Sequence, residues 1–321
     1  MPPVVLLGFG NRELPGDALE QVRMIAPDHE FIVTDKADEI EKYLDRIEIA
    51  VRHVPLSLLY RAPLVRWYHH WYAGVDWLER FPRIREGGLM VTNASGVHAV
   101  SVTEHLLSMM LAFARNLHLN VRAQARREWR RETMNALFEL AGKRLLVVGL
   151  GAIGEHFARA ARGLGMEVTG IRRHPDRASD AVARVYGTEH LHEELSKADF
   201  VVIILPATQD TRSLFSTREF EAMREGSYFI NIGRGSIVDE PALIEALRKG
   251  RIRGAGLDVF ETEPLPPDSP LWDMEQVIIT PHTGGFTLEY FRRSWPIFTE
   301  NLKRYIEGRP LLNVVNKAAG Y

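Results

Sequence analysis

Short runs of apolar and β-branched residues alternate along the whole chain with longer segments of helical periodicity. The apolar runs lie at residues 4–9, 30–35, 47–53, 65–72 and 89–94, and again at 144–150, 167–173, 199–205, 227–233, 254–260 and 276–282. Amphipathic segments separate them, among them residues 16–26, 36–47, 152–165 and 240–250. Nearly continuous apolar strands between helices are typical of parallel sheets covered on both faces. The pattern therefore predicts an α/β fold with two doubly wound parallel-sheet domains.

Two long helical segments predict how these domains are connected. Residues 101–129 have the pattern of one helix that bridges the domains, and the last helix, residues 288–308, follows the final strand of the middle region. We expect this last helix to return to the first domain. The predicted organisation is a discontinuous first domain, residues 1–98 and 287–321, into which a second domain, residues 99–286, is inserted.

Composition narrows the functional classes. The 321 residues include 40 Lys and Arg against 42 Asp and Glu, so the net charge of −2 gives no general attraction to nucleic acid or to acidic membranes. The absence of cysteine excludes disulfides, thiolate metal sites and cysteine nucleophiles. The histidines do not have the spacing of a helical ligand pair, so no metal site is expected. No apolar run reaches 18 residues and the first residues lack the basic region of a secretion signal, so we expect a cytoplasmic protein.

A glycine-rich turn lies between the strand at 144–150 and the helix at 152–165. Gly149, Gly151 and Gly154 have the spacing G-x-G-x-x-G. The first glycine permits a tight turn, the second lets the backbone approach a pyrophosphate, and the third lets helix and strand pack closely. The free N–H groups at the helix N-terminus favour phosphate. This context predicts a Rossmann-type dinucleotide site.

Two arginines stand where an NAD-binding chain usually carries a carboxylate. Arg172 and Arg173 end the second strand of this region. A carboxylate would accept hydrogen bonds from both ribose hydroxyls and repel a 2′-phosphate, whereas the planar fork of arginine pairs with phosphate oxygens. The sequence therefore favours NADPH over NADH. An exposed basic loop without a ligand is the alternative.

Three later strands of the middle region each end in polar residues, among them an arginine, a glutamate and a histidine that suit carbonyl reduction. Arg234, then Asp258 with Glu263, and finally His282 follow these strands. In an open parallel sheet, the carboxyl ends of the strands line the ligand crevice. A histidine there can donate a proton to the carbonyl oxygen as hydride arrives, and a glutamate can keep it protonated. An arginine can bind a carboxylate and polarise the carbonyl.

These residues lie in long motifs that resemble a known family. The segment from residue 93 to residue 315 is similar to the D-isomer-specific 2-hydroxyacid dehydrogenases, in the motifs GLGAIG, LPATQDTRSL, INIGRGSIVDE, GLDVFETEPLP and TPHTGG. The resemblance implies that Arg234 binds the substrate carboxylate, His282 performs acid–base chemistry and Glu263 is its partner. Glu261 is the competing acid. Arginine at position 172, in place of the NAD carboxylate, resembles the pattern of the glyoxylate and hydroxypyruvate reductase branch of this family.

The resemblance also implies the remaining contacts and the assembly. The implied cofactor-binding residues are Gly149, Gly151, Ala152, Ile153, Gly154, Arg172, Arg173, Leu205, Pro206, Thr211, Ile232, Gly233 and Asp258. The backbone of Ala73 and Gly74 would hold the carboxylate of a small 2-ketoacid or 2-hydroxyacid in a flavodoxin-like substrate domain. Residues 118–140 would form an arm that embraces a second subunit of a homodimer, with Trp129 as an anchor. The nearby aromatic residues at positions 67–77 are expected mainly in the core, with one or two in the pocket wall.

Two other functions remain open on the same residues. A non-enzymatic NAD(P)-sensing corepressor can retain the three polar residues, although this chain lacks the additional peptide-docking regions that such proteins usually carry. A phosphite dehydrogenase relative would use a similar set. Glutamate rather than glutamine at position 263 argues against the formate dehydrogenase relatives. We attach no function to Thr283, where the family commonly has an aliphatic residue.

Overall fold

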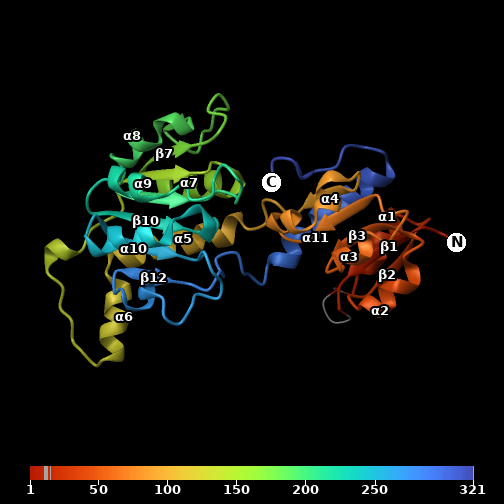
Figure 1. Cartoon of the computed structure of the whole chain (residues 1–321), viewed down its shortest axis with the longest axis horizontal. Coiled ribbons are helices and arrows are strands. Elements are labelled where there is room, and N and C mark those ends of the chain that lie inside the picture. Colours follow the sequence, from red (N-terminus) through yellow and green to blue (C-terminus); the bar gives the residue numbers. More distant parts are fainter. Residues whose placement is uncertain (11–13, 15, 321) are drawn as a thin grey trace. The chain divides into compact units, whose positions relative to one another are not determined.

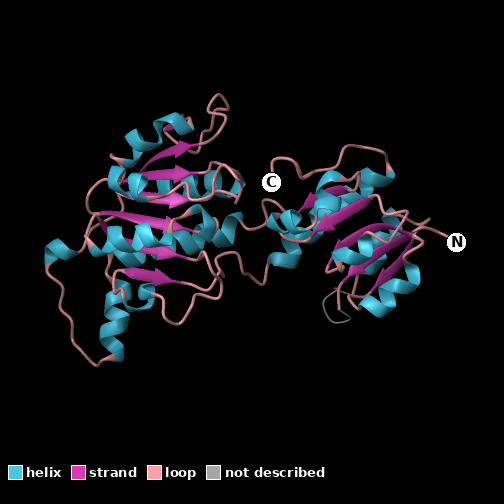
Figure 2. Ribbon diagram, viewed as in Figure 1, coloured by secondary structure: helices cyan, strands magenta, loops and turns pink. Residues whose placement is uncertain are grey.

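The computed structural model describes residues 1–10, 14 and 16–320, and these divide into two compact units (Figure 1). The first unit comprises Met1–Val97 together with Leu288–Tyr321, and the second comprises His98–Thr287. In each unit a sheet is flanked by helices, as the ribbon diagram shows (Figure 2).

The first unit contains a parallel sheet of five described strands. Their spatial order is β2 (Glu30–Val33), β1 (Val4–Gly8), β3 (Ile47–Arg52), β4 (Trp67–His70) and β5 (Met90–Asn93). The order 2-1-3-4-5 is that of flavodoxin-like folds. Its helices are α1 (Ala18–Ile25), α2 (Ala37–Ile40), η1 (Glu41–Tyr43), α3 (Leu56–Leu59), η2 (Asp76–Arg80), α4 (Pro82–Glu86) and α11 (Tyr290–Ile306).

Strand β1 shows why both faces of this sheet are covered. Successive side chains of a strand point to opposite faces. Val5 and Leu7 pack with side chains of α1 and α11, whereas Val4 and Leu6 pack with side chains of α2, α3 and α4. All four are fully buried, so a strand without a polar side is stable only between two helical layers.

The second unit contains a parallel sheet of seven described strands. Their order is β12 (Val277–Ile279), β11 (Ile252–Leu257), β10 (Ser227–Asn231), β9 (Phe200–Ile203), β6 (Arg144–Val148), β7 (Glu167–Ile171) and β8 (Arg184–Tyr186). Counted from β6, this is the Rossmann order 3-2-1-4-5-6 with one further strand, and it reverses between β6 and β9. Ligands bind at such a switch point, outside the carboxyl ends of the strands.

Helices cover both faces of this second sheet. They are α5 (Ala99–Ala114), α6 (Leu117–Ala125), η3 (Met134–Ala136), α7 (Ala152–Gly163), η4 (Thr188–His190), α8 (Leu191–Leu195), α9 (Thr217–Ala222), η5 (Gly235–Ile237), α10 (Glu240–Arg248) and η6 (Pro270–Asp273). Leu145 and Val147 of β6 pack with α5 and α7, and Leu146 and Val148 pack with α8, α9 and α10. Both sheets confirm the predicted fold class.

The prediction of one helix over residues 101–129 is wrong. Helix α5 ends at Ala114, Asn116 has a left-handed φ of 51°, and α6 then runs only from Leu117 to Ala125. Asparagine is one of the few residues that adopt this conformation readily. The apolar period continues across the break, so periodicity alone does not reveal it. The predicted helix at 36–47 is likewise shorter, as α2 and η1, and the three-residue edge strand β8 was not predicted.

Candidate active site

The glycine turn has the geometry that a bound diphosphate requires. Gly149 has a φ of +112°, and a Cβ there would lie 2.3 Å from the carbonyl oxygen of Ile204. A Cβ on Gly154 would lie 2.1 Å from the carbonyl oxygen of Gly149, whereas one on Gly151 would meet nothing within 4 Å. Gly151 caps α7, which places the first helical residues, Ala152 and Ile153, at the open side of the turn. The turn therefore leaves room for phosphate in front of free helical N–H groups.

The two arginines lie beyond the end of β7, and both are paired with carboxylates. Arg172 Nη2 donates to Glu155 Oε1 at 2.9 Å. The Arg172 side chain is only 9% exposed, and its Nε is buried without a hydrogen-bond partner among the described residues. Arg173 Nη2 donates to Asp210 Oδ2 at 2.8 Å, and both of those side chains are exposed. The sequence predicted the two cations but not these partners.

The loops after β9 and β10 lie against each other. Thr211 Oγ1 donates to the carbonyl oxygen of Pro206 at 2.7 Å, which fixes the loop that begins at Leu205. A Cβ on Gly233 would lie 2.7 Å from the carbonyl oxygen of Leu205. Ile232 and Gly233 are therefore beside the loop that holds the other predicted cofactor residues.

Arg234 is held at the start of the loop after β10. Its Nη1 donates to the carbonyl oxygen of Gly233 at 2.7 Å, and Asn231 Nδ2 donates to the carbonyl oxygen of Arg234 at 3.0 Å. A Cβ on the next residue, Gly235, would lie 1.9 Å from the carbonyl oxygen of Phe260. Only glycine allows this approach, which brings Arg234 beside the loop that follows β11.

Glu263 and His282 form a hydrogen-bonded pair within the second unit. His282 Nδ1 lies 2.8 Å from Glu263 Oε2, and the other oxygen, Oε1, accepts the backbone N–H of Phe260 at 3.0 Å. The two side chains are 46% and 37% exposed. If Nδ1 carries the proton, the other ring nitrogen, Nε2, can exchange a proton with a ligand. Glu261 is oriented differently, because its backbone N–H donates to Glu240 Oε2 at 2.7 Å.

Asp258 fixes the segment that carries His282. Its carboxylate is only 3% exposed and accepts the Thr280 hydroxyl at 2.6 Å and the backbone N–H groups of Thr283 and Gly284, each at 3.0 Å. Both carboxylate oxygens therefore accept hydrogen bonds from residues that precede and follow His282 in the sequence. The sequence had indicated Asp258 only as a cofactor contact.

The sequence also did not predict that His105 lies beside Thr280 and Asp258. Its Nε2 lies 3.0 Å from Thr280 Oγ1 and 3.6 Å from Asp258 Oδ1, so it extends this buried polar group to helix α5. A histidine inside an amphipathic helix gives no signal of such a contact, because its partner is distant in the sequence.

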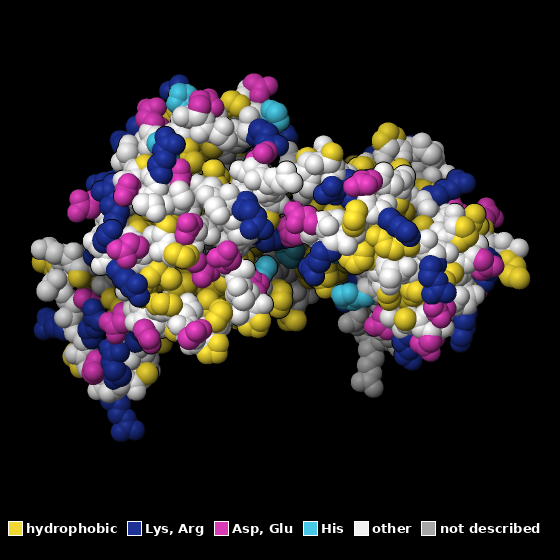
Figure 3. All heavy atoms as spheres, viewed as in Figure 1, with side chains coloured by type: hydrophobic (Ala, Val, Ile, Leu, Met, Phe, Trp, Pro, Cys, Tyr) yellow, Lys and Arg dark blue, Asp and Glu magenta, His cyan; other side chains and the backbone are white. Residues whose placement is uncertain are grey.

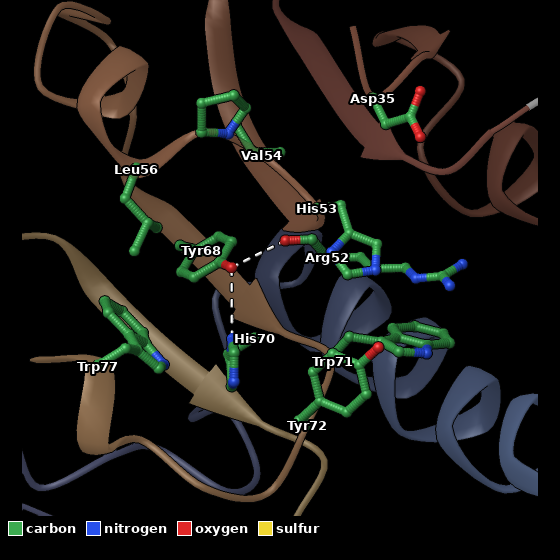
Figure 4. Close-up of a pocket in the computed structure, with 11 residues that line it drawn as sticks. Asp35, Arg52, His53, Val54, Leu56, Tyr68, His70, Trp71, Tyr72 and Trp77 are labelled. Carbon is green, nitrogen blue, oxygen red and sulfur yellow. Dashed lines mark hydrogen bonds between the residues drawn. The ribbon is translucent and has the colours of Figure 1, made fainter. Parts of the chain in front are cut away.

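In the first unit, Ala73 and Gly74 follow β4 beside an open pocket. The carbonyl oxygen of Ala73 accepts Asn93 Nδ2 at 2.7 Å. The pocket has a volume of about 390 Å³ and is lined by Asp35, Arg52, His53, Val54, Pro55, Leu56, Tyr68, His70, Trp71, Tyr72 and Trp77 (Figure 4). Burial lowers the pKa of His70 to about 4, so its ring is neutral at pH 7.

The aromatic side chains near this loop divide between core and pocket wall. Trp67 is fully buried and stacks on Tyr305 with ring centroids 5.5 Å apart. Trp71 is also buried, yet it borders the pocket together with the more exposed Tyr72. In Figure 4, Tyr72 and Trp77 approach the space from opposite sides. Four of these aromatic residues, Tyr68, Trp71, Tyr72 and Trp77, line this pocket, which is more than the one or two expected from the sequence.

The charged side chains of the described residues form neither a basic face on the side of the second unit that is drawn in Figure 3 nor a cluster that could bind a metal ion. Basic and acidic side chains are interspersed on the face of the second unit seen in Figure 3. Within residues 1–10, 14 and 16–320, no three His, Asp or Glu side chains are grouped so that they could hold a metal ion. None of the helices in this part of the chain is long and apolar enough to span a bilayer.

Known sequences that are similar to this chain are named as dehydrogenases or reductases. Residues 107–284 match the family model described as "D-isomer specific 2-hydroxyacid dehydrogenase, NAD binding domain". A D-3-phosphoglycerate dehydrogenase of Methanocaldococcus jannaschii is 34% identical over 88% of this chain, and the match spans 54% of that longer protein. A glyoxylate reductase of Pyrococcus furiosus is 30% identical over 96% of this chain and 95% of its own length. The glyoxylate/hydroxypyruvate reductase B of an Enterobacter species is 39% identical over 67% of each chain.

Solved structures match both units. A D-isomer specific 2-hydroxyacid dehydrogenase from Xanthobacter autotrophicus Py2, in complex with NADPH and MES, has a TM-score of 0.83 and 30% identity and covers 99% of each chain. An NADPH-dependent glyoxylate/hydroxypyruvate reductase from Sinorhizobium meliloti, in complex with NADP and sulfate, has a TM-score of 0.83 and 28% identity and covers 100% of each chain. These matches confirm the predicted fold class and the resemblance read from the motifs.

Proposed function

The chain belongs to the D-isomer specific 2-hydroxyacid dehydrogenase family, and we propose that it reduces a small 2-ketoacid, such as glyoxylate or hydroxypyruvate, to the D-2-hydroxyacid with NADPH. The observation that carries this proposal is the pair formed by His282 Nδ1 and Glu263 Oε2 at 2.8 Å. A histidine held in this way is a suitable proton donor for a carbonyl oxygen.

Each residue of the proposed site has one task. The guanidinium of Arg234 binds the substrate carboxylate and polarises the adjacent carbonyl. For the first unit by itself, we propose that the backbone N–H groups of Ala73 and Gly74 bind substrate. NADPH, when bound, supplies the hydride. His282 donates the proton from Nε2 to the carbonyl oxygen, and Glu263 stabilises the protonated ring before that transfer.

The cofactor proposal rests on the shape of the turn and on the cations beside it. The open space at Gly151 suits a diphosphate, and the mostly shielded guanidinium of Arg172 supports the proposal of a 2′-phosphate ligand. Structures similar to this chain, described above, contain NADPH and NADP. We therefore assign residues 99–286 to an NADP-binding domain, and residues 1–98 with 287–321 to a substrate domain. We also propose that the enzyme is cytoplasmic.

The assembly proposal rests on exposed apolar side chains on α6 and in the segment between α6 and β6. Trp129 is 96% exposed and Met134 is 93% exposed, and Leu117 and Val121 on α6 are more than half exposed. Exposed apolar residues of this size in one segment mark an interaction site. We propose that the arm of residues 118–140 embraces a second copy of the chain in a homodimer.

The activity is tested by steady-state kinetics on a substrate panel. Glyoxylate, hydroxypyruvate, pyruvate and larger 2-ketoacids are offered with NADPH as reductant. Phosphite is offered with NADP as oxidant. We expect reduction of a 2-ketoacid, and we expect His282→Ala to lower kcat by ~10²–10⁴ while NADPH still binds. The matched control is His190→Ala, because His190 is also 46% exposed and paired with a carboxylate. Equal activity of the two variants, or no turnover of any ketoacid, would contradict the proposal.

A further inference from the structure

Glu155 occupies an unexpected place beside the proposed 2′-phosphate site. It follows Gly154 in the first turn of α7 and accepts a hydrogen bond from Arg172 at 2.9 Å. The Arg172 side chain is 9% exposed and that of Glu155 is 26% exposed, so the pair is shielded from water on most sides. Shielding strengthens the attraction between the two charges. The cation assigned to the cofactor is therefore already neutralised by a side chain of the protein.

We propose that Glu155 is a specificity-determining residue whose carboxylate competes with the cofactor 2′-phosphate for Arg172. This inference rests on the proposed role of Arg172 as the phosphate-binding residue. The competition weakens the binding of a 2′-phosphorylated nucleotide and leaves the binding of the unphosphorylated nucleotide unaffected. Glu155 thus limits the preference for NADPH that Arg172 creates.

The argument begins with the hydrogen-bond donors of Arg172. A guanidinium has five N–H donors and no acceptor. One Nη2 donor is used by Glu155, and Nε is buried without a partner among the described residues. A phosphate that binds the same guanidinium comes close to the Glu155 carboxylate, and like charges at that separation repel. Phosphate binding therefore either displaces Glu155 or takes place against its charge.

A second cation, Arg159, also lies close to the Glu155 carboxylate. Glu155 Oε2 lies 3.7 Å from Arg159 Nη2, one turn along α7, and Arg159 is also bonded to Asp180 at 2.7 Å. Glu155 therefore keeps an ion pair, the existing one with Arg159, when its contact with Arg172 is lost. The position of Glu155 in the first helical turn also favours a negative charge, which explains why a carboxylate that opposes the cofactor is compatible with the fold.

The experiment measures nucleotide binding without turnover. Isothermal titration calorimetry on the full chain gives the Kd of adenosine 2′,5′-bisphosphate and of adenosine 5′-monophosphate for five proteins: unmodified, Glu155→Gln, Glu167→Gln, Arg172→Gln and the double variant with both Glu155→Gln and Arg172→Gln. Glu167 is the matched control, because it is an exposed carboxylate at the other end of β7 that is paired with an arginine, Arg144, at 3.3 Å.

The expected result separates charge competition from general effects. Glu155→Gln should tighten the bisphosphate about three- to tenfold and leave the monophosphate unchanged, because removing one nearby like charge acts only on the 2′-phosphate. Glu167→Gln should change neither Kd by more than about twofold, since exposed charges at that distance are screened. Arg172→Gln should weaken the bisphosphate by roughly tenfold or more, and in the double variant the gain from Glu155→Gln should disappear.

Two contrary results have different meanings. If Arg172→Gln weakens the bisphosphate but Glu155→Gln weakens it too or leaves it unchanged, the inference is overturned and Glu155 instead holds Arg172 in place. If Arg172→Gln changes nothing, Arg172 does not bind the 2′-phosphate, so the cofactor proposal fails and the inference fails with it. Urea unfolding curves of each variant establish that the protein titrated is folded.

Discussion

Replacing Glu263 by glutamine tests the proposed mechanism most directly. The amide has the shape of the carboxylate, so it can still accept the backbone N–H of Phe260 and remain beside His282. What it removes is the negative charge that favours the protonated imidazole. Ketoacid reduction needs His282 protonated and is lost as pH rises, whereas oxidation of the hydroxyacid needs the neutral ring. The same substitution should therefore impair reduction and favour oxidation.

The size of the effect follows from the geometry of the pair. The nitrogen and oxygen are 2.8 Å apart, and each side chain is more than a third exposed. With the dielectric of water, two unit charges at this distance attract by ~1.5 kcal/mol. Without that attraction, reduction should still proceed at low pH and should fail at a lower pH than in the unmodified enzyme. The oxidation rate should gain at lower pH.

The assay is kcat/KM as a function of pH in both directions, because that ratio reports the ionisations of the free enzyme. The control is Glu261→Gln, which neutralises an exposed carboxylate two residues away whose backbone is bonded to Glu240. It should leave both profiles in place. An unchanged profile for Glu263→Gln in both directions would refute the pairing, and a shift in the control variant would transfer the role to Glu261.

Four further outcomes are expected. NADPH should exceed NADH by at least about tenfold in kcat/KM, since a charge-assisted contact contributes roughly 1.5–3 kcal/mol before exposure reduces it, and Arg172→Asp should invert the order; equal use of both cofactors contradicts this. Arg234→Lys should raise KM for the ketoacid steeply with little change in NADPH binding, because an ammonium cannot copy the two-pronged contact. Light scattering at micromolar concentration should give twice 36.5 kDa, and a particle of 36.5 kDa would disprove the arm of residues 118–140. Burial lowers the pKa of His70 to about 4, so the stability due to its neutral form is present above about pH 6.5 and is lost as pH falls toward 4, by ~1.4 kcal/mol per pH unit. Burial also lowers the pKa of the neighbouring His69 to about 3, so His70→Gln should reduce the slope in urea unfolding curves by the contribution of His70 alone.

The strands were predictable because buried parallel strands leave a simple signal. Every strand of the second sheet except β8 overlaps a predicted apolar run, and the glycine turn located the switch point of that sheet. The break at Asn116 was not predictable, because a single left-handed residue interrupts the helix without interrupting its apolar period. Strand β8 has three residues at a sheet edge, too few to stand out from a loop.

The candidate site was predictable as a set of strand ends but not as a set of contacts. The motifs placed Arg172 after β7, yet its partner is Glu155 on α7, in a different element, and no spacing rule connects the two. The same holds for Asp258, whose hydrogen bonds run to Thr280, Thr283 and Gly284 after the next strand. Position along a strand fixes the edge at which a side chain lies, whereas its charge partner depends on the path of each loop.

Three glycines explain how those loops come together along one edge of the second sheet. Gly149, after β6, and Gly233, after β10, both approach the backbone that follows β9, with Cβ positions 2.3 Å and 2.7 Å from carbonyl oxygens there. Gly235 approaches the backbone after β11, with a Cβ position 1.9 Å from a carbonyl oxygen. These contacts join four loops that are far apart in the sequence, and any side chain at these positions would force them apart. The glycines of the motif thus determine more than the cofactor turn, because they also set the separation between Arg234 and the pair formed by Glu263 and His282.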